Sequence, residues 1–188
     1  YLGHSAFEIE LDKKKILIDP WITNPNSPVK LEDFKRLDYI FVTHSHGDHL
    51  GEAVELSKRT GAPVVTIYEI SQIVERGNGK AIGTNIGGPV RLEGVTAVFT
   101  PAFHTGNCAG VVLIGKETVI YHAGDTGVFG DMQLIRELYN PKIALLPIGG
   151  HFTMGPIEAT KAAELLKPEI VIPMHYNTFP LIEADPNE

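Results

Sequence analysis

The sequence has very little cysteine: Cys108 is the only one among 188 residues, so no internal disulfide can form. It also has no apolar run near the roughly 18–20 residues that a membrane-spanning helix needs, and no cluster of lysine or arginine longer than three residues. These absences exclude a disulfide scaffold and argue against a broad surface for nucleic acid or membrane. Since no signal-peptide pattern opens the chain, we expect a cytoplasmic protein with no membrane partner.

The composition is that of a globular protein with an acidic balance. Lysine and arginine number 16 against 23 aspartate and glutamate, a net charge of −7, and 43% of the residues are hydrophobic. This length predicts a single domain over residues 1–188. A small anionic substrate stays compatible with the acidic total, because a bound metal ion can reverse the local field.

Hydrophobic patterning predicts a mixture of strands and helices. Strands are expected where apolar residues alternate with polar ones or run continuously: 7–11, 15–18, 39–42, 63–67, 95–100, 109–114, 118–121, 143–146 and 169–172. Helical spacing marks residues 52–60, 69–76, 131–139 and 156–166. The five glycines between Gly77 and Pro89 predict a loop. Hairpins that give way to alternating strands and helices favour two sheets flanked by helices, an α/β fold of the α+β type.

The histidines carry the chemical signal, since several of the eight cluster directly after the predicted strand at 39–42. The segment reads Thr43-His44-Ser45-His46-Gly47-Asp48-His49. His44 and His46 point the same way in an extended chain, and Gly47 allows a bend that turns Asp48 and His49 toward a second ion. Imidazole and carboxylate suit Zn, Mn, Fe or Ni, and the absence of a nearby thiolate argues against a structural zinc finger.

Three more residues of ligand type follow predicted strands. They are His104, Asp125 and His175. Ligands at strand ends are held by a rigid scaffold, which a metal centre requires. We therefore expect these three to join the cluster at one site.

The whole set resembles the five-motif pattern of the metallo-β-lactamase superfamily. The sequence motifs at residues 2–7, 121–127, 149–156 and 173–180 are similar to those of a family of prokaryotic metal-dependent hydrolases close to the L-ascorbate-6-phosphate lactonases. The resemblance covers essentially the whole chain and implies a four-layer αββα sandwich with the metals at one edge of two sheets. It also implies the ligand sets: His44, His46 and His104 for one metal, Asp48, His49 and His175 for the other, and Asp125 as the bridge.

The chain departs from that family in two places. The loop after His104 is short, and we expect family residues to have been deleted there or to be absent from this chain. Family members also continue past the equivalent of Asp185. Since the chain starts at Tyr1 rather than Met, we expect the domain to be truncated at both ends.

The resemblance implies a hydrolase with two divalent ions, zinc first, with manganese, iron or nickel compatible. Two ions about 3.5–4 Å apart can share a hydroxide that attacks a small ester, lactone or phosphodiester. Asp48 would position that hydroxide or accept its proton. The alternatives are a nuclease of the same superfamily, which the net charge disfavours, and a non-catalytic metal-binding protein, which an open site disfavours. A homo-oligomer is also expected.

The remaining histidines have weaker signals. His4 lies at a bend after Gly3, where it could bind substrate or protonate a leaving group, or serve only as a structural histidine. His151 precedes the helix at Pro156 in a glycine-rich loop that could hold an anion, which makes it a substrate-site candidate. His122 is expected in the core or behind the ligands.

Four other residues have side chains that could contribute to a site. Tyr176 and Asn177 follow a predicted ligand and could line the pocket, although solvent-facing polar residues would give the same pattern. Trp21 is expected to pack rather than to bind. Cys108 is expected to be a small buried hydrophobe rather than a nucleophile.

Overall fold

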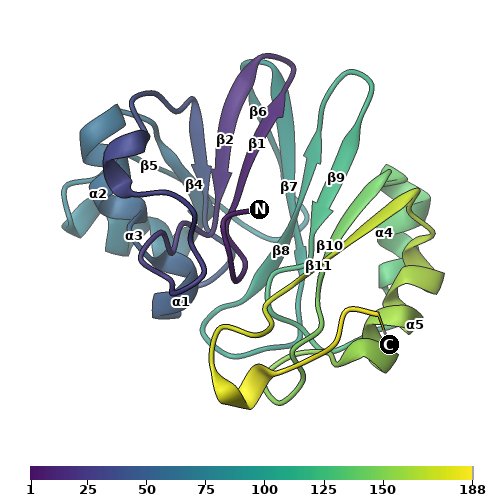
Figure 1. Cartoon of the computed structure of the whole chain (residues 1–188). Helices are drawn as coiled ribbons and strands as arrows, with labels where there is room; N and C mark the ends of the chain where they lie inside the picture. Colours follow the sequence, from purple (N-terminus) through teal and green to yellow (C-terminus); the bar gives the residue numbers. More distant parts are fainter. Residues whose placement is uncertain (188) are drawn as a thin grey trace.

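A computed structural model describes residues 1–187 of the chain as two β-sheets with helices around them (Figure 1). The strands are β1 (Phe7–Leu11), β2 (Lys14–Ile18), β3 (Tyr39–Phe41), β4 (Val64–Ile67), β5 (Ala81–Thr84), β6 (Pro89–Leu92), β7 (Val95–Pro101), β8 (Ala109–Ile114), β9 (Val119–His122), β10 (Ile143–Pro147) and β11 (Ile170–Met174). The helices are α1 (Gly47–Leu50), α2 (Ala53–Thr60), α3 (Tyr68–Arg76), α4 (Met132–Tyr139) and α5 (Pro156–Leu166), with 3-10 turns η1 (Leu31–Asp33) and η2 (Pro180–Ile182).

The two sheets form the inner layers of a sandwich. The first has the order β1-β2-β3-β4-β5 and the second the order β11-β10-β9-β8-β7-β6. Figure 1 shows α2 and α3 beyond the first sheet and α4 and α5 beyond the second. The expected αββα arrangement is confirmed.

The core lies between the sheets and under the helices. Phe41 of β3 and Phe99 of β7 are fully buried, and their ring centroids are 6.4 Å apart across the two sheets. Ile16 and Ile18 of β2 are buried in the same cluster. Burying each such side chain contributes roughly 1.5–3 kcal/mol, so the interface between the sheets is a main source of stability and a rigid support for the strand ends.

Strand direction determines where the chemistry gathers. In the first sheet, β2, β3 and β4 are parallel. In the second sheet, β9, β10 and β11 are parallel, and β7 runs in the same direction because both β7 and β9 are antiparallel to β8. The carboxyl ends of parallel strands meet at one edge of a sheet, where ligands bind in open α/β folds.

The predicted helices and most strands are found within one or two residues of their expected ends, but two local predictions are wrong. Residues 77–89 are not one loop, since β5 pairs in parallel with β4 over Val64 to Ile67. Gly47, where a bend was expected, is instead the first residue of the one-turn helix α1. The positive φ in this segment occurs at Gly51, with φ +42°.

No helix among residues 1–187 has the length and apolar character to cross a membrane. This agrees with the hydropathy of the sequence, whose apolar runs are all short.

Candidate metal centre

The seven predicted metal ligands converge at the carboxyl ends of the strands. His44, His46, Asp48 and His49 follow β3, His104 follows β7, Asp125 follows β9, and His175 follows β11. Their side-chain nitrogen and oxygen atoms fall into groups within 4.8 Å: His44 with His46 and His104, His44 with His49 and Asp125, and His4 with Asp48, His49 and His175. The strand-end residues that the sequence singled out therefore lie together.

The first group has the spacing of ligands around one ion. His44 Nε2 lies 3.1 Å from His46 Nδ1, which in turn lies 3.3 Å from His104 Nε2. Nitrogen ligands 2.0–2.1 Å from a tetrahedral ion are about 3.3 Å apart, so a divalent ion fits between the three rings.

The second group meets the first at Asp125. His175 Nε2 is 3.1 Å from Asp125 Oδ2, and His49 Nε2 is 3.2 Å from Asp125 Oδ1. The same carboxylate lies 3.5 Å from His104 Nε2 and 3.7 Å from His44 Nε2. Asp125 therefore reaches histidines of both groups.

Several of these atoms are buried without a hydrogen-bond partner among residues 1–187. They are His49 Nε2, Asp125 Oδ1 and His175 Nε2. An unpaired buried polar atom costs roughly 1–3 kcal/mol, so native proteins rarely leave several together without a reason. Coordination to a metal ion would satisfy these lone pairs.

A carboxylate that was missing from the sequence prediction supports the ligands from behind. Asp19 is fully buried, and it accepts a hydrogen bond from His49 Nδ1 at 2.8 Å and another from Thr43 Oγ1 at 2.6 Å. Since the Thr43 proton is used there, His44 Nδ1 donates to Thr43 Oγ1 at 3.1 Å. We assign these tautomers from the hydrogen bonds, and they leave the Nε2 atoms of both histidines directed at the site.

Charge in the site is arranged for cations. Burial would raise the pKa of Asp125, but the charge of the nearby histidines, His49 first, holds it well below its usual range. Burial would lower the pKa of His49, yet the carboxylates of Asp125 and Asp19 raise it well above its usual value, so an ion bound to His49 would have to displace its proton. Burial lowers the pKa of His44 to about 3 and keeps that ring neutral, as a metal ligand must be.

The backbone is strained where it presents these side chains. His4, Asp19 and His175 have φ of +54°, +45° and +54°, a region that non-glycine residues seldom occupy. Gly124, just before Asp125, has φ +63°, and a Cβ there would lie 2.6 Å from the Ala109 carbonyl oxygen. Such strain clusters at functional sites, because surrounding contacts must hold it in place.

His4 is held by protein on both ring nitrogens. The carboxylate of Asp48 carries no proton, so His4 Nε2 donates to Asp48 Oδ2 at 3.0 Å, and His4 Nδ1 accepts from Thr178 Oγ1 at 2.7 Å. The His4 side chain is fully buried, between Trp21 and His175. Its predicted direct contact with substrate would require one of these bonds to break.

His122 lies in the core, as expected. Its Nε2 donates to the Ser5 carbonyl at 3.0 Å and its Nδ1 accepts from the Gly124 amide at 3.1 Å. It thereby joins the segment before Asp125 to the segment after His4, and keeps the two parts of the site in register.

Two other candidates are not members of the ligand groups. His151 is exposed and its ring packs edge-on against Phe152, so its substrate role stays a prediction. Cys108 is buried with its thiol directed at the Asp125 carbonyl, and burial raises its pKa, as expected for a residue that is no nucleophile.

A cavity of about 430 Å³ opens onto the ligands. Its lining consists of His46, Asp48, His104, Thr105, Asp125, Phe152, His175, Phe179 and Leu181. The aromatic and aliphatic residues come from the loop before α5 and from the segment around η2. The motifs at residues 149–156 and 173–180 contain Phe152 and Phe179, but the sequence did not predict that these side chains line the cavity.

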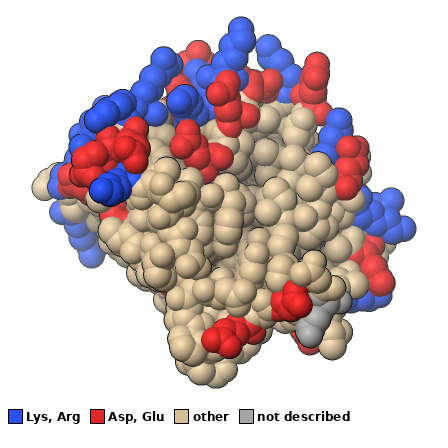
Figure 2. Space-filling model, in the orientation of Figure 1, with Lys and Arg blue, Asp and Glu red and all other residues tan. Residues whose placement is uncertain are grey.

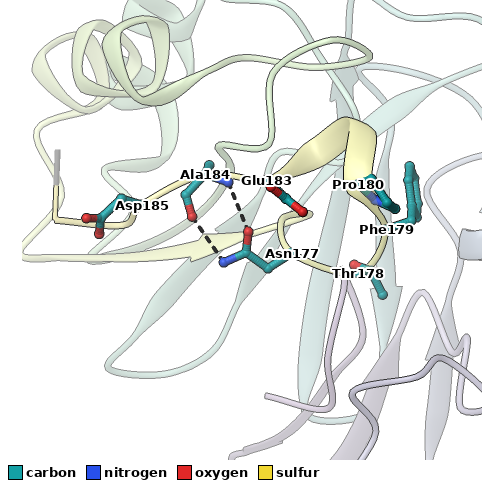
Figure 3. Close-up of a pocket in the computed structure, with 7 residues that line it drawn as sticks. All are labelled: Asn177, Thr178, Phe179, Pro180, Glu183, Ala184 and Asp185. Carbon is teal, nitrogen blue, oxygen red and sulfur yellow. Dashed lines mark hydrogen bonds between the residues drawn. The ribbon is translucent and has the colours of Figure 1, made fainter.

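A second groove lies beside this cavity and shares Phe179 with it (Figure 3). There the Asn177 side chain donates from Nδ2 to the Ala184 carbonyl at 3.1 Å and accepts from the Ala184 amide at 2.9 Å. The Asn177 amide also donates to the Ile182 carbonyl at 2.8 Å. Asn177 therefore closes the loop that carries Phe179 and Leu181, a role that its position next to a ligand did not reveal.

Comparison with known proteins gives a consistent result. The model of the "Beta-lactamase superfamily domain" matches residues 14–176. A UPF0173 metal-dependent hydrolase from Thermofilum pendens is 60% identical, and one from Staphylothermus marinus is 58% identical, each over the whole of this chain and 87% of the relative. The solved structure of a metallo hydrolase from Ignicoccus hospitalis superposes with a TM-score of 0.94 at 49% identity, covering all of this chain and 85% of that one.

Proposed function

The chain belongs to the beta-lactamase superfamily and, within it, to the UPF0173 metal-dependent hydrolases, and from this premise we propose that it is a dinuclear hydrolase of small esters, lactones or phosphodiesters. One ion would be held by His44, His46 and His104. The other would be held by Asp48, His49 and His175, with Asp125 between the two. Zinc is the expected metal, and manganese, iron and nickel suit the same donors.

The convergence of both histidine groups on Asp125 is the observation that carries this proposal. Its two oxygens lie 3.1–3.7 Å from His44, His49, His104 and His175. A single ion cannot use all four imidazoles, Asp48 and His46 together in tetrahedral coordination, so the donor set supports two ions.

The bound ions would supply Lewis acidity and would lower the pKa of water toward neutrality. Asp48 is the residue placed to handle the proton. Its side chain is partly exposed to the cavity, and the hydrogen bond from His4 lowers its pKa against the effect of burial, so it is ionised at neutral pH. The oxygen of water bonds to the acyl carbon or phosphorus, the bond to the leaving oxygen breaks, and Asp48 passes the proton from water to the leaving group.

His4 would act through Asp48 rather than on substrate. Thr178 donates to His4 and His4 donates to Asp48, so the carboxylate is fixed by a chain that ends in the loop after His175. This makes His4 a positioning residue. Its substitution by glutamine should lower kcat while KM changes little, because the cavity lining stays intact.

The test combines metal analysis with a substrate screen. Purified protein loaded separately with Zn, Mn, Fe or Ni should contain two ions per chain by elemental analysis, and should hydrolyse at least one aryl ester, lactone or phosphodiester. Asp125→Ala should lose both activity and at least one ion. Glu158→Ala, an exposed change in α5, is the matched control and should keep both.

Two results would contradict the proposal. One ion per chain at saturating metal would remove the second site. A metal-loaded protein that hydrolyses none of the three substrate classes would remove the assigned chemistry and favour a non-catalytic metal protein.

A further inference from the structure

The cavity over the metal ligands lacks any basic side chain among the described residues. Apart from the predicted ligands, its lining is Thr105, Phe152, Phe179 and Leu181. The groove beside it is lined by Asn177, Thr178, Phe179, Pro180, Glu183, Ala184 and Asp185, again without lysine or arginine. Whatever part of a substrate extends beyond the ligands therefore meets aromatic, aliphatic, neutral polar or acidic groups, and no lysine or arginine.

The sequence shows that this absence extends to every loop at the site. Lysine and arginine are missing from the segments 19–29, 43–57, 96–115, 117–135, 143–160 and 168–188. These segments contain all the strand-end loops that carry the predicted ligands. Figure 2 agrees: lysine and arginine lie along the upper margin and the sides of this face, whereas its lower centre is almost free of blue.

The apolar residues face one another at the entrance. The ring centroids of Phe152 and Phe179 are 6.4 Å apart with the planes inclined at 60°. Phe152 is 46% exposed and Leu181 is 59% exposed, so a considerable apolar surface is open to solvent at the mouth of a site that is otherwise polar. Exposed apolar groups concentrated at a cavity mark a binding surface.

We propose that the substrate is a neutral ester or lactone with an apolar acyl or aryl chain, and that Phe152, Phe179 and Leu181 bind that chain. This inference rests on the proposed function and narrows it. The lack of lysine and arginine in both linings disfavours a phosphate, sulfonate or carboxylate on the distal part of the substrate. Such a group would have no cation to pair with beyond the metals, and Glu183 and Asp185 would repel it along the groove.

The decisive experiment compares three lactones on the metal-loaded protein. They share the same reacting ring: γ-butyrolactone has no tail, γ-nonalactone has a pentyl tail, and γ-butyrolactone-γ-carboxylate has a short anionic tail. Burying one methylene is worth about two- to fourfold, so kcat/KM for γ-nonalactone should exceed that for γ-butyrolactone by about 100-fold. The carboxylate should be the poorest of the three.

Variants assign the effect to residues. Phe152→Ala and Phe179→Ala should each lower kcat/KM for γ-nonalactone at least tenfold more than for γ-butyrolactone. Leu181→Lys changes an exposed side chain and should raise kcat/KM for the carboxylate while lowering it for γ-nonalactone. Tyr68→Ala, which removes an exposed ring from α3, is the matched control and should change none of these values.

The outcomes separate this inference from the proposed function. Equal kcat/KM for the three lactones, a preference for the carboxylate, or faster hydrolysis of bis(p-nitrophenyl) phosphate than of γ-nonalactone would overturn the inference and leave the hydrolase assignment standing. Absence of metal-dependent hydrolysis of every substrate would instead overturn the proposed function.

Discussion

At the scale of single residues, one carboxylate behind the predicted ligands holds two of them in place. Asp19 holds His49 and, through Thr43, His44, although it lies 25 residues before the ligand cluster begins. The carboxylate fixes the tautomers that direct the Nε2 atoms of both rings into the site.

Substitution of Asp19 by asparagine removes the negative charge of the side chain while keeping its size and shape. We expect Asp19→Asn to weaken metal binding about 10- to 100-fold, because an amide is a poorer acceptor for His49 Nδ1–H. Competition with a chromophoric chelator measures the affinity. Asp33→Asn, in the exposed η1, is the control, and equal affinities for the two variants would show that Asp19 does not support the ligands.

Gly124 gives a second residue-level test, on stability. In Gly124→Ala the new Cβ would meet the Ala109 carbonyl oxygen in a left-handed backbone, so we expect a loss of about 1–3 kcal/mol in the free energy of unfolding. Gly127→Ala introduces the same methyl where nothing lies within 4 Å and should be nearly neutral. Urea denaturation of both variants compares them, and similar midpoints would refute the argument.

The convergence of the seven predicted ligands could be anticipated because their signal is local. His44, His46, Asp48 and His49 stand together in the chain, and the other three follow recognisable apolar runs. Asp19 also ends a strand, yet it was not identified, because its role arises only when β2 and β3 lie side by side. The bonds of His4 to Asp48 and Thr178 join residues 44 and 174 positions apart, which no local pattern encodes.

At the scale of elements, the predictions succeeded where hydrophobic period was strong. Helix α5 starts at Pro156 and ends at Leu166 as expected. Strand β5 was missed because Ala81–Thr84 is short, contains glycine and is only partly buried, so its formation depends on pairing with β4. Tertiary pairing of this kind overrides local preference.

The loop around η2 offers a test at this scale. The side chain of Asn177 makes two hydrogen bonds to Ala184, and each contributes about 0.5–1.5 kcal/mol to stability. The backbone of Asn177 has φ +56°. In Asn177→Ala and Asn177→Gly we expect the Ala184 amide to exchange its hydrogen about tenfold faster or more. The glycine variant relieves the backbone strain, so faster exchange in both variants attributes the effect to the lost side chain, and wild-type rates in both would exclude it.

At the scale of the whole molecule, the candidate metal site lies where the two sheets meet. The first sheet contributes the cluster after β3, and the second contributes His104, Asp125 and His175. Ions bound between them would cross-link the halves of the sandwich and stabilise the native state by mass action.

Metal removal should therefore lower stability globally. Treatment with a chelator is expected to reduce the melting temperature, with a loss of about 4 kcal/mol relative to protein at a metal concentration 1,000 times the dissociation constant. Differential scanning calorimetry with and without metal measures this. Asp125→Ala should respond less to the chelator than the wild type, and an equal response would place the stabilising ion elsewhere.

The distribution of the ligands along the chain also sets an order of assembly. The first predicted group, His44, His46 and His104, is complete before β8. The second group, Asp48 and His49, also needs His175, which follows β11. His4 gains its hydrogen bond from Thr178 only after that. During synthesis, a nascent chain would thus possess the three-histidine group long before the other. An ion bound early would have only the three-histidine group available as a binding site. The site of Asp48, His49 and His175 would be completed only when β11 has joined the sheet.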